Sequence, residues 1–271
     1  MTSGKWDTRI ERARALEKIH PSASEGLRFY ERVAQAQKSI SADLESQFEK
    51  VKKQRAPGGL RQEFDLFFLL PRLAPFLSIV EQHAPSPLAL LVHAMRLRNG
   101  NHAREMLVRF WEAGSVAAAD LEPAEALVSW AFLQPYAEFL AGTMDVSSSG
   151  ETPSLCPLCS GKPLVGVLRQ EGDGGKRSLI CALCAHEWNY RRILCPDCGA
   201  EDPHKLAVYS AEGIAHVRVE ACDVCRHYIK TVDLTKDGRA VPVVDDLATI
   251  PLDLWAREHG YEKLQVNLLG M

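Results

Sequence analysis

The first 144 residues place their apolar side chains at steps of three and four, which is the period of an amphipathic α-helix. The clearest run lies between Pro21-Ser22, typical of a helix start, and Pro57-Gly58-Gly59, typical of a helix end. Its inward positions are Leu27, Tyr30, Val33, Ala34, Gln37, Ile40, Leu44, Phe48 and Val51. We expect further helices at 63–83, 87–98, 102–112 and 123–144. The pattern predicts an all-helical domain with short antiparallel connections. Its expected core contains Met95, Leu107, Phe110, Trp111, Trp130, Phe132 and Tyr136.

The period changes after a serine-containing linker at residues 147–155. Short segments that alternate polar and apolar residues follow, and they predict strands at 163–170, 176–180, 186–193, 205–210, 214–220 and 228–234. Glycines within 172–175 and 211–213 are typical of hairpin turns. Residues 245–260 return to a helical period. The fold class that we predict is therefore α with a small β part.

All eight cysteines lie between residues 156 and 225, and each belongs to a Cys-x-x-Cys pair. Two sets have the forms Cys-x2-Cys-x21-Cys-x2-Cys and Cys-x2-Cys-x23-Cys-x2-Cys. The first set is Cys156, Cys159, Cys181 and Cys184, and the second is Cys195, Cys198, Cys222 and Cys225. Steps of 39 residues from Cys156 to Cys195 and of 41 from Cys181 to Cys222 indicate an internal repeat. Both spacings are close to those of rubredoxin-like and zinc-ribbon modules.

Each set of four thiolates is suited to one tetrahedral metal ion. Two thiolates separated by two residues reach the same ion from a tight turn, and a second turn across a hairpin completes the tetrahedron. A unit of about 40 residues buries too little apolar surface to fold alone, and structural metal binding contributes an apparent ~10–16 kcal/mol. We expect ligands to pair within each repeat and not between repeats. Four thiolates suit zinc and rubredoxin-type iron equally, so the spacing leaves the metal open.

The predicted organisation has five parts. A helical domain at 1–146 and a linker at 147–155 are followed by modules at 156–194 and 195–240, and by a helical tail at 241–271. Gly199, directly after Cys198, is suited to a positive φ in the metal-binding turn. Ser160 stands at the equivalent place after Cys159, where we expect Gly161 to supply the same freedom.

Charge and composition narrow the classes of partner. The net charge is −3, and residues 151–271 carry 14 basic against 17 acidic side chains, so the broad positive field of most nucleic-acid-binding proteins is missing. The charged N-terminus lacks the apolar core of a secretory signal, and the apolar stretch 64–80 is interrupted by Pro71, Arg72 and Pro75. We expect a cytoplasmic protein without membrane insertion, whose paired cysteines bind metal and do not form disulfides.

The sequence contains no nucleophile elbow, phosphate-binding glycine loop or His-Glu-x-x-His motif, so we do not expect an enzyme. His186 and His227 each stand two residues after the last cysteine of a set. They are either strand residues that pack on the metal-binding turn, which we favour, or donors that modulate the thiolates.

The cysteine-containing segments resemble the formate dehydrogenase accessory protein FdhE family. The similar segments are Cys156-Pro-Leu-Cys-Ser-Gly-Lys-Pro, Cys181-Ala-Leu-Cys-Ala-His-Glu-Trp, Arg192-Ile-Leu-Cys-Pro-Asp-Cys-Gly and Cys222-Asp-Val-Cys-Arg-His-Tyr. The tail looks like that family's ending at Val244-Asp-Asp-Leu-Ala-Thr-Ile-Pro-Leu-Asp and Glu258-His-Gly-Tyr. The resemblance covers most of the chain, although specific motifs lie only in its cysteine-rich half.

The resemblance implies an assembly factor that binds the catalytic subunit of respiratory formate dehydrogenase in the cytoplasm before that subunit is exported. It also implies rubredoxin-like iron sites, so iron is favoured in both cysteine sets and zinc is the alternative. A homodimer is a further expectation from the resemblance. Two other functions stay open: a zinc ribbon that binds nucleic acid, and a rubredoxin-type protein for electron transfer or redox sensing.

Overall fold

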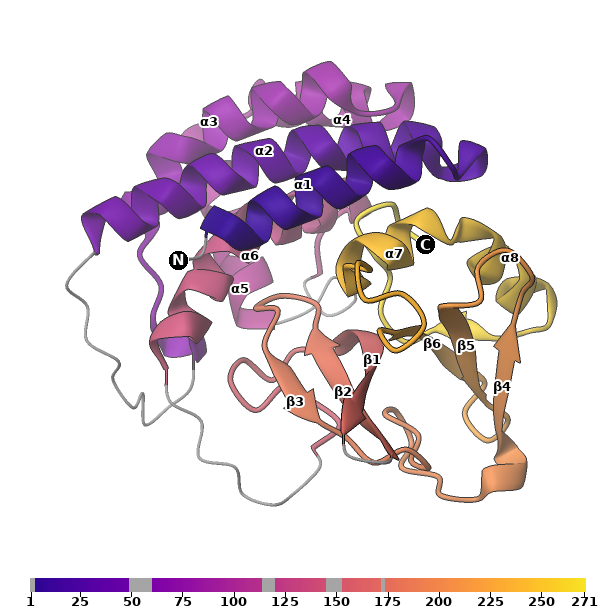
Figure 1. The fold of residues 1–271 in the computed structure, drawn as a ribbon. Coiled ribbons are helices and arrows are strands. Elements are labelled where there is room, and N and C mark those ends of the chain that lie inside the picture. Colours follow the sequence, from indigo (N-terminus) through magenta and orange to yellow (C-terminus); the bar gives the residue numbers. More distant parts are fainter. Residues whose placement is uncertain (1–2, 49–59, 114–119, 145–152, 172–173) are drawn as a thin grey trace.

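A helical part of the chain precedes the strands and a shorter helical tail follows them, as the changes of hydrophobic period predict. The computed structural model describes residues 3–48, 60–113, 120–144, 153–171 and 174–271. The expected helix end at 57–59 lies outside these residues, as do most of the linker at 147–155 and part of the turn at 172–175. The predicted fold class is confirmed within the described residues, because a helical layer lies above a small mixed sheet (Figure 1).

The helical layer contains α1 (Ser3–Glu17), α2 (Ser24–Gln47), α3 (Leu66–His83), α4 (Ser86–Arg96), α5 (Gly100–Ala113) and α6 (Pro123–Thr143). Short 3₁₀ turns precede α2 at Pro21–Ala23 and α3 at Leu60–Gln62. Asp65 caps α3 by accepting a hydrogen bond from the backbone N–H of Phe68 over 2.9 Å. The side chains expected in the core of this layer are all buried.

Helix α6 is buried on nearly all sides, unlike an amphipathic surface helix. It packs against α2 and α5, and its Trp130 reaches the first cysteine-rich unit. Every residue from Val128 to Glu138 is buried. The helix therefore joins the helical layer to the first cysteine-rich unit.

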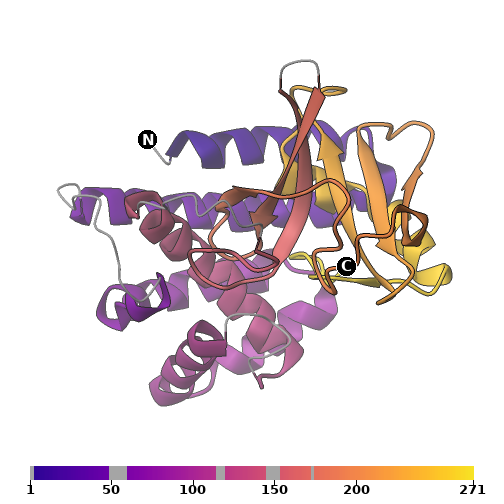
Figure 2. The same ribbon diagram turned by 90° about the horizontal axis from the view of Figure 1, so that it is seen from below.

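Each cysteine-rich unit supplies three strands of one sheet. The first unit contains β1 (Pro163–Glu171), β2 (Gly174–Cys181) and β3 (Glu187–Asn189), and the second contains β4 (Leu206–Ser210), β5 (Val217–Cys222) and β6 (His227–Asp233). A 3₁₀ turn at Pro203–Lys205 precedes β4. The strand order is β3-β2-β1-β6-β5-β4 (Figure 1). Figure 2 shows the same fold from below. Strand β3 is shorter than the segment 186–193 that the alternation predicts.

The two units meet where β1 and β6 run parallel, with Gly166 opposite Thr231. A Cβ atom on Gly166 would overlap with Oγ1 of Thr231, so this position requires glycine. Arg177 of β2, in the first unit, also forms an ion pair of 2.7 Å with Glu220 of β5, in the second unit. The tandem modules are thus joined into a continuous sheet, which the spacing of the cysteines did not predict.

The tail differs from the single helix expected at 245–260. It contains α7 (Pro242–Ala248), α8 (Ile250–Glu258) and the short strand β7 (Glu262–Lys263), which pairs parallel to β6. The break between the helices lies at Thr249, and Pro251 follows in the first turn of α8, where its missing N–H is tolerated.

The first helix and the tail meet where α1 packs against α7. Arg12 donates to both carboxylate oxygens of Asp245, over 3.0 and 2.5 Å, and Asp245 is fully buried. Buried apolar side chains of the helices, both units and the tail form a continuous core. Among the described helices, none is both long enough and apolar enough to span a membrane.

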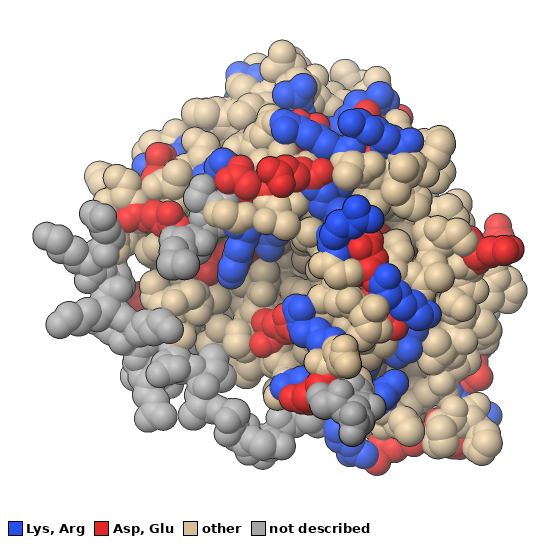
Figure 3. Space-filling model, viewed as in Figure 1, with Lys and Arg blue, Asp and Glu red and all other residues tan. Residues whose placement is uncertain are grey.

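Basic and acidic side chains are interspersed on the face shown in Figure 3. Many charged side chains of the described residues form ion pairs, such as Arg14 with Glu31 and Arg169 with Glu187. Local pairing of this kind weakens the positive field that a polyanion would meet.

Candidate metal centres

The structure brings the first predicted set of cysteines together. Cys156 and Cys159 lie in the loop before β1, Cys181 is the last residue of β2, and Cys184 lies in the turn before β3. The Sγ atoms of Cys156 and Cys184 are 3.5 Å apart, and those of Cys159 and Cys181 are 3.3 Å apart. All four side chains are at most 2% exposed.

The second set converges in the same way at the other end of the sheet. Cys195 and Cys198 precede β4, Cys222 ends β5, and Cys225 precedes β6. The Sγ distances across the site are 3.7 Å for Cys195–Cys225 and 3.7 Å for Cys198–Cys222. Here Cys198 is exposed and Cys225 is half-buried. The cysteines therefore group within each repeat, as expected, and the two groups differ in their access to solvent.

Both quartets fit one tetrahedral ion each. The four sulfur atoms of a quartet all lie within 4.8 Å of one another. Sulfur atoms bound to one ion at about 2.3 Å lie about 3.8 Å apart, close to the observed 3.3–3.7 Å. A disulfide requires about 2.05 Å, so these pairs are not cross-links. Two S₄ sites that can hold metal ions are present, and their geometry suits iron and zinc alike.

The four Cys-x-x-Cys turns share a backbone conformation. The residue after each second cysteine has a positive φ: 56° at Ser160, 50° at Ala185, 72° at Gly199 and 62° at Arg226. The expectation for Gly199 is confirmed, whereas the expectation that Gly161 replaces Ser160 is wrong. In three of the turns the N–H of this residue donates to the carbonyl of the first cysteine, over 2.8 to 3.1 Å. This hydrogen bond keeps the backbone of the residue in the left-handed region, even where the residue has a Cβ atom.

Burial and backbone N–H groups act in opposite directions on the second quartet. Burial raises the pKa of the Cys195 thiol to about 11, although the N–H groups of Cys198 and Asp197 oppose this shift. At Cys222 burial also favours the thiol, but the N–H groups of Cys225 and Val224, together with the side chains of Cys195 and Cys198, outweigh it, and the pKa is lowered. Metal binding must therefore displace protons from some thiols of this site at neutral pH.

The helical layer holds both turns of the first quartet. The N–H of Leu60 donates to the carbonyl of Leu158 over 2.9 Å, and Arg61 donates to the carbonyl of Cys159 over 2.6 Å. On the other side of the quartet, the indole of Trp130 donates to the carbonyl of Ala182 over 3.0 Å. Sequence reasoning missed these contacts, because their partners are far apart in the chain.

The two equivalent histidines have different surroundings. His186 stacks on Trp188, with ring centroids 6.4 Å apart and 5° between the planes, and burial lowers its pKa. This arrangement fits the favoured interpretation of a packing residue. Nδ1 of His227 instead lies 3.0 Å from the carboxylate of Asp197.

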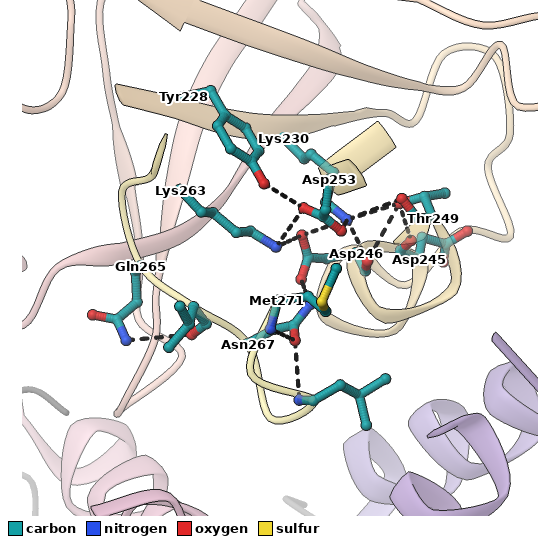
Figure 4. A network of polar contacts seen from close by, with 12 residues as sticks. Tyr228, Lys230, Asp245, Asp246, Thr249, Asp253, Lys263, Gln265, Asn267 and Met271 are labelled. Atoms are coloured by element: carbon teal, nitrogen blue, oxygen red, sulfur yellow. Dashed lines mark hydrogen bonds and ion pairs between the residues drawn. The ribbon is translucent and has the colours of Figure 1, made fainter. Parts of the chain in front are cut away.

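A buried polar network fixes the tail against the second unit (Figure 4). Lys230 of β6 donates to Asp253 over 2.6 Å, and Lys263 of β7 lies 2.7 Å from Asp246 and 3.2 Å from Asp253. Tyr228 also donates to Asp253, over 2.8 Å. Two lysines and two aspartates balance in charge. Sequence reasoning missed this network, although carboxylates seven residues apart in an otherwise apolar helical segment were a usable sign.

Comparisons with known proteins agree with this architecture. The family model "FdhE, central domain" matches residues 155–192, and "FdhE, C-terminal domain" matches residues 193–269. A "Protein FdhE homolog" of Aquifex aeolicus is 27% identical over 96% of this chain and 94% of its own length. Another, of Pseudomonas aeruginosa, is 35% identical over 82% of this chain and 74% of its own length.

A solved structure extends the likeness to the whole fold. It is described as the crystal structure of the FdhE protein from Pseudomonas aeruginosa. It superposes with a TM-score of 0.72 at 26% identity, and the match covers 99% of this chain and 96% of that one. The chain belongs to the FdhE family.

Proposed function

We propose that this protein is an accessory factor for the maturation of respiratory formate dehydrogenase and binds its catalytic subunit in the cytoplasm. The observation that carries the proposal is a pair of cysteine quartets built into a continuous sheet, in a chain of the FdhE family. In this proposal the ions are structural elements that fix the surfaces of the two units. The protein then acts by recognition and does not transform a substrate.

The proposal assigns one ion to each quartet, with Cys156, Cys159, Cys181 and Cys184 as ligands of the first and Cys195, Cys198, Cys222 and Cys225 as ligands of the second. Iron is the favoured ion because of the family resemblance, and zinc is the alternative. Elemental analysis and visible absorption of the full chain, purified without oxygen, test this assignment. We expect two ions per chain with the absorption of iron–thiolate sites. Fewer than two bound ions would contradict it.

The partner is tested by co-purification. We expect the full chain to retain a formate dehydrogenase catalytic subunit produced in the same cells. Cys159→Ser, which removes a ligand of the buried quartet, is expected to weaken this retention at least tenfold. An exposed Lys236→Met variant serves as the matched control. Failure of the wild-type chain to retain the subunit, with two ions bound, would refute the partner and leave the metal assignment intact.

The proposal also includes a homodimer and excludes nucleic acid as a partner. Sedimentation of the full chain tests the first statement. Titration with DNA and RNA at two salt concentrations tests the second, because electrostatic binding to nucleic acid weakens strongly with salt.

Rubredoxin-type electron transfer is a second candidate, favoured by the exposure of Cys198 at the second quartet. An electron carrier needs a metal ion close to the surface, and this quartet satisfies that requirement. Reversible one-electron reduction of the anaerobically purified protein would support this function. Purified protein that contains only zinc would exclude it.

A further inference from the structure

A second set of ligand atoms lies on the open side of the second quartet. The carboxylate of Asp197, Sγ of Cys225 and a ring nitrogen of His227 all lie within 4.8 Å of one another. Asp197 is exposed, while Cys225 and His227 are half-buried. Asp197 and His227 also line the same small cavity as Cys195 and Cys222. The carboxylate and the imidazole thus border the second quartet on a side where Asp197 is open to solvent.

The contact between Asp197 and His227 has the spacing of two ligands of one ion. Nδ1 of His227 is 3.0 Å from the carboxylate, yet this buried nitrogen has no hydrogen-bond partner within the described residues. Nitrogen and oxygen atoms bound to one tetrahedral zinc ion at about 2.0–2.1 Å lie about 3.3 Å apart. The two atoms are therefore close enough for a shared ion, without a well-directed hydrogen bond that an ion would have to break.

The first unit provides an internal comparison, because the repeat places other residues at the equivalent positions. Leu158 stands in place of Asp197 and carries no ligand atom. His186, the counterpart of His227, stacks on Trp188 beside a quartet whose cysteines are at most 2% exposed. The mixed carboxylate–histidine pair thus accompanies the exposed quartet and not the buried one.

We propose that Asp197, Cys225 and His227 form a loading site for a divalent transition-metal ion, through which the second quartet takes up and exchanges its ion. Oxygen, imidazole nitrogen and thiolate together suit borderline ions such as Fe²⁺ and Zn²⁺. Cys225 belongs to both sets, so an ion held there already has one of its four final ligands. It reaches the quartet when Asp197 and His227 are replaced by Cys195, Cys198 and Cys222. Each thiol that binds releases its proton to solvent, and no electron is transferred.

The inference rests on the proposed metal binding by both quartets. The experiment distinguishes a failure of the loading site from a failure of metal binding. The full chain loaded with zinc is mixed with Cd²⁺, and the rise of cadmium–thiolate absorption gives the rate of exchange. Native mass spectrometry counts zinc and cadmium per chain. We expect one ion to exchange fast and the other slowly. Cys198→Ser should remove the fast phase, and Cys159→Ser should remove the slow one, which assigns each phase to its quartet.

Asp197→Asn and His227→Gln are expected to slow the fast phase about tenfold or more, with two zinc ions still bound at the start. His186→Gln, the matched change in the first unit, should leave both phases unaltered. An unchanged fast phase in Asp197→Asn and His227→Gln would overturn the proposed loading site. It would mean that Asp197 and His227 form an ion pair only. Fewer than two zinc ions in the wild-type chain would instead refute the metal assignment. Asp197→Asn preserves the shape of the side chain, so it keeps the test decisive if His227→Gln does not fold.

Discussion

The indole Nε1 of Trp130 donates a hydrogen bond of 3.0 Å to the carbonyl oxygen of Ala182, which lies between Cys181 and Cys184. This bond connects α6 directly to a turn of the first quartet. Both groups are buried, so neither finds water if the bond is broken.

Trp130→Phe should therefore destabilise the protein by about 1–3 kcal/mol, because it leaves a buried carbonyl with a weaker set of partners. We also expect the ion of the first quartet to be lost to a chelator faster than in the wild type. Denaturant unfolding and chelator-driven release measure the two effects. Trp255→Phe, in α8, is the control, and an equal effect there would show that the bond to Ala182 has no special role.

The positive φ in the Cys-x-x-Cys turns predicts opposite effects on stability for two substitutions. Ala185 has φ = 50°, so Ala185→Gly should stabilise the protein by about 1 kcal/mol, because the left-handed region costs a residue with a Cβ about 1–2 kcal/mol. Gly199→Ala should destabilise it by a similar amount, since a Cβ there meets open space and only φ = 72° is unfavourable. Unfolding curves of both metal-loaded variants test this, and changes of equal sign would contradict it.

The contact between the units is tested by Gly166→Ala. The added methyl group overlaps with Thr231, so we expect a loss of about 1–3 kcal/mol in the free energy of unfolding. Thr231→Ala removes the overlapping oxygen, and the double variant should recover part of the loss. A double-mutant cycle measures this coupling. Strictly additive effects would mean that the two strands do not meet at this pair.

The buried network makes Lys230→Met costly. Lys230 is fully buried against Asp246 and Asp253, and removal of one partner of a buried ion pair typically costs about 3–5 kcal/mol. The exposed Lys236→Met, by comparison, should change stability by less than about 0.5 kcal/mol. Urea unfolding compares the two, and a small loss for Lys230→Met would show that the network is readily replaced by apolar packing.

The same network predicts a dependence on pH. Burial alone would raise the pKa of Asp246, but Lys230 and Lys263 outweigh it and lower the pKa. The stabilisation is therefore complete above the unfolded-state pKa of about 3.9 and is lost as pH falls through the lower folded-state value. We expect the stability gap between the wild type and Asp246→Asn to be constant from pH 7 to about pH 5 and to narrow below about pH 4. A gap that widens in acid would contradict this.

The sequence revealed those parts of the fold that depend on local spacing. Helices α2 to α6, strands β1 to β6 and both quartets follow from periods and from the Cys-x-x-Cys pairs, although β3 is shorter than expected. The parallel contact of β1 with β6 could not be predicted, because it depends on Gly166 meeting Thr231 across 65 positions. Nor could Asp246 and Asp253 be placed, since their lysine partners come from other strands. Contacts between distant segments depend on packing, which local periodicity does not predict.

Arg12 and Asp245 are 233 positions apart, and this separation has a consequence during synthesis. At about 5–20 residues per second, a ribosome needs roughly ten to fifty seconds to travel from one residue to the other. During that interval α7 does not yet exist, so the guanidinium of Arg12 cannot form its ion pair with Asp245. The contact between α1 and α7 is therefore among the last to form during synthesis of this protein.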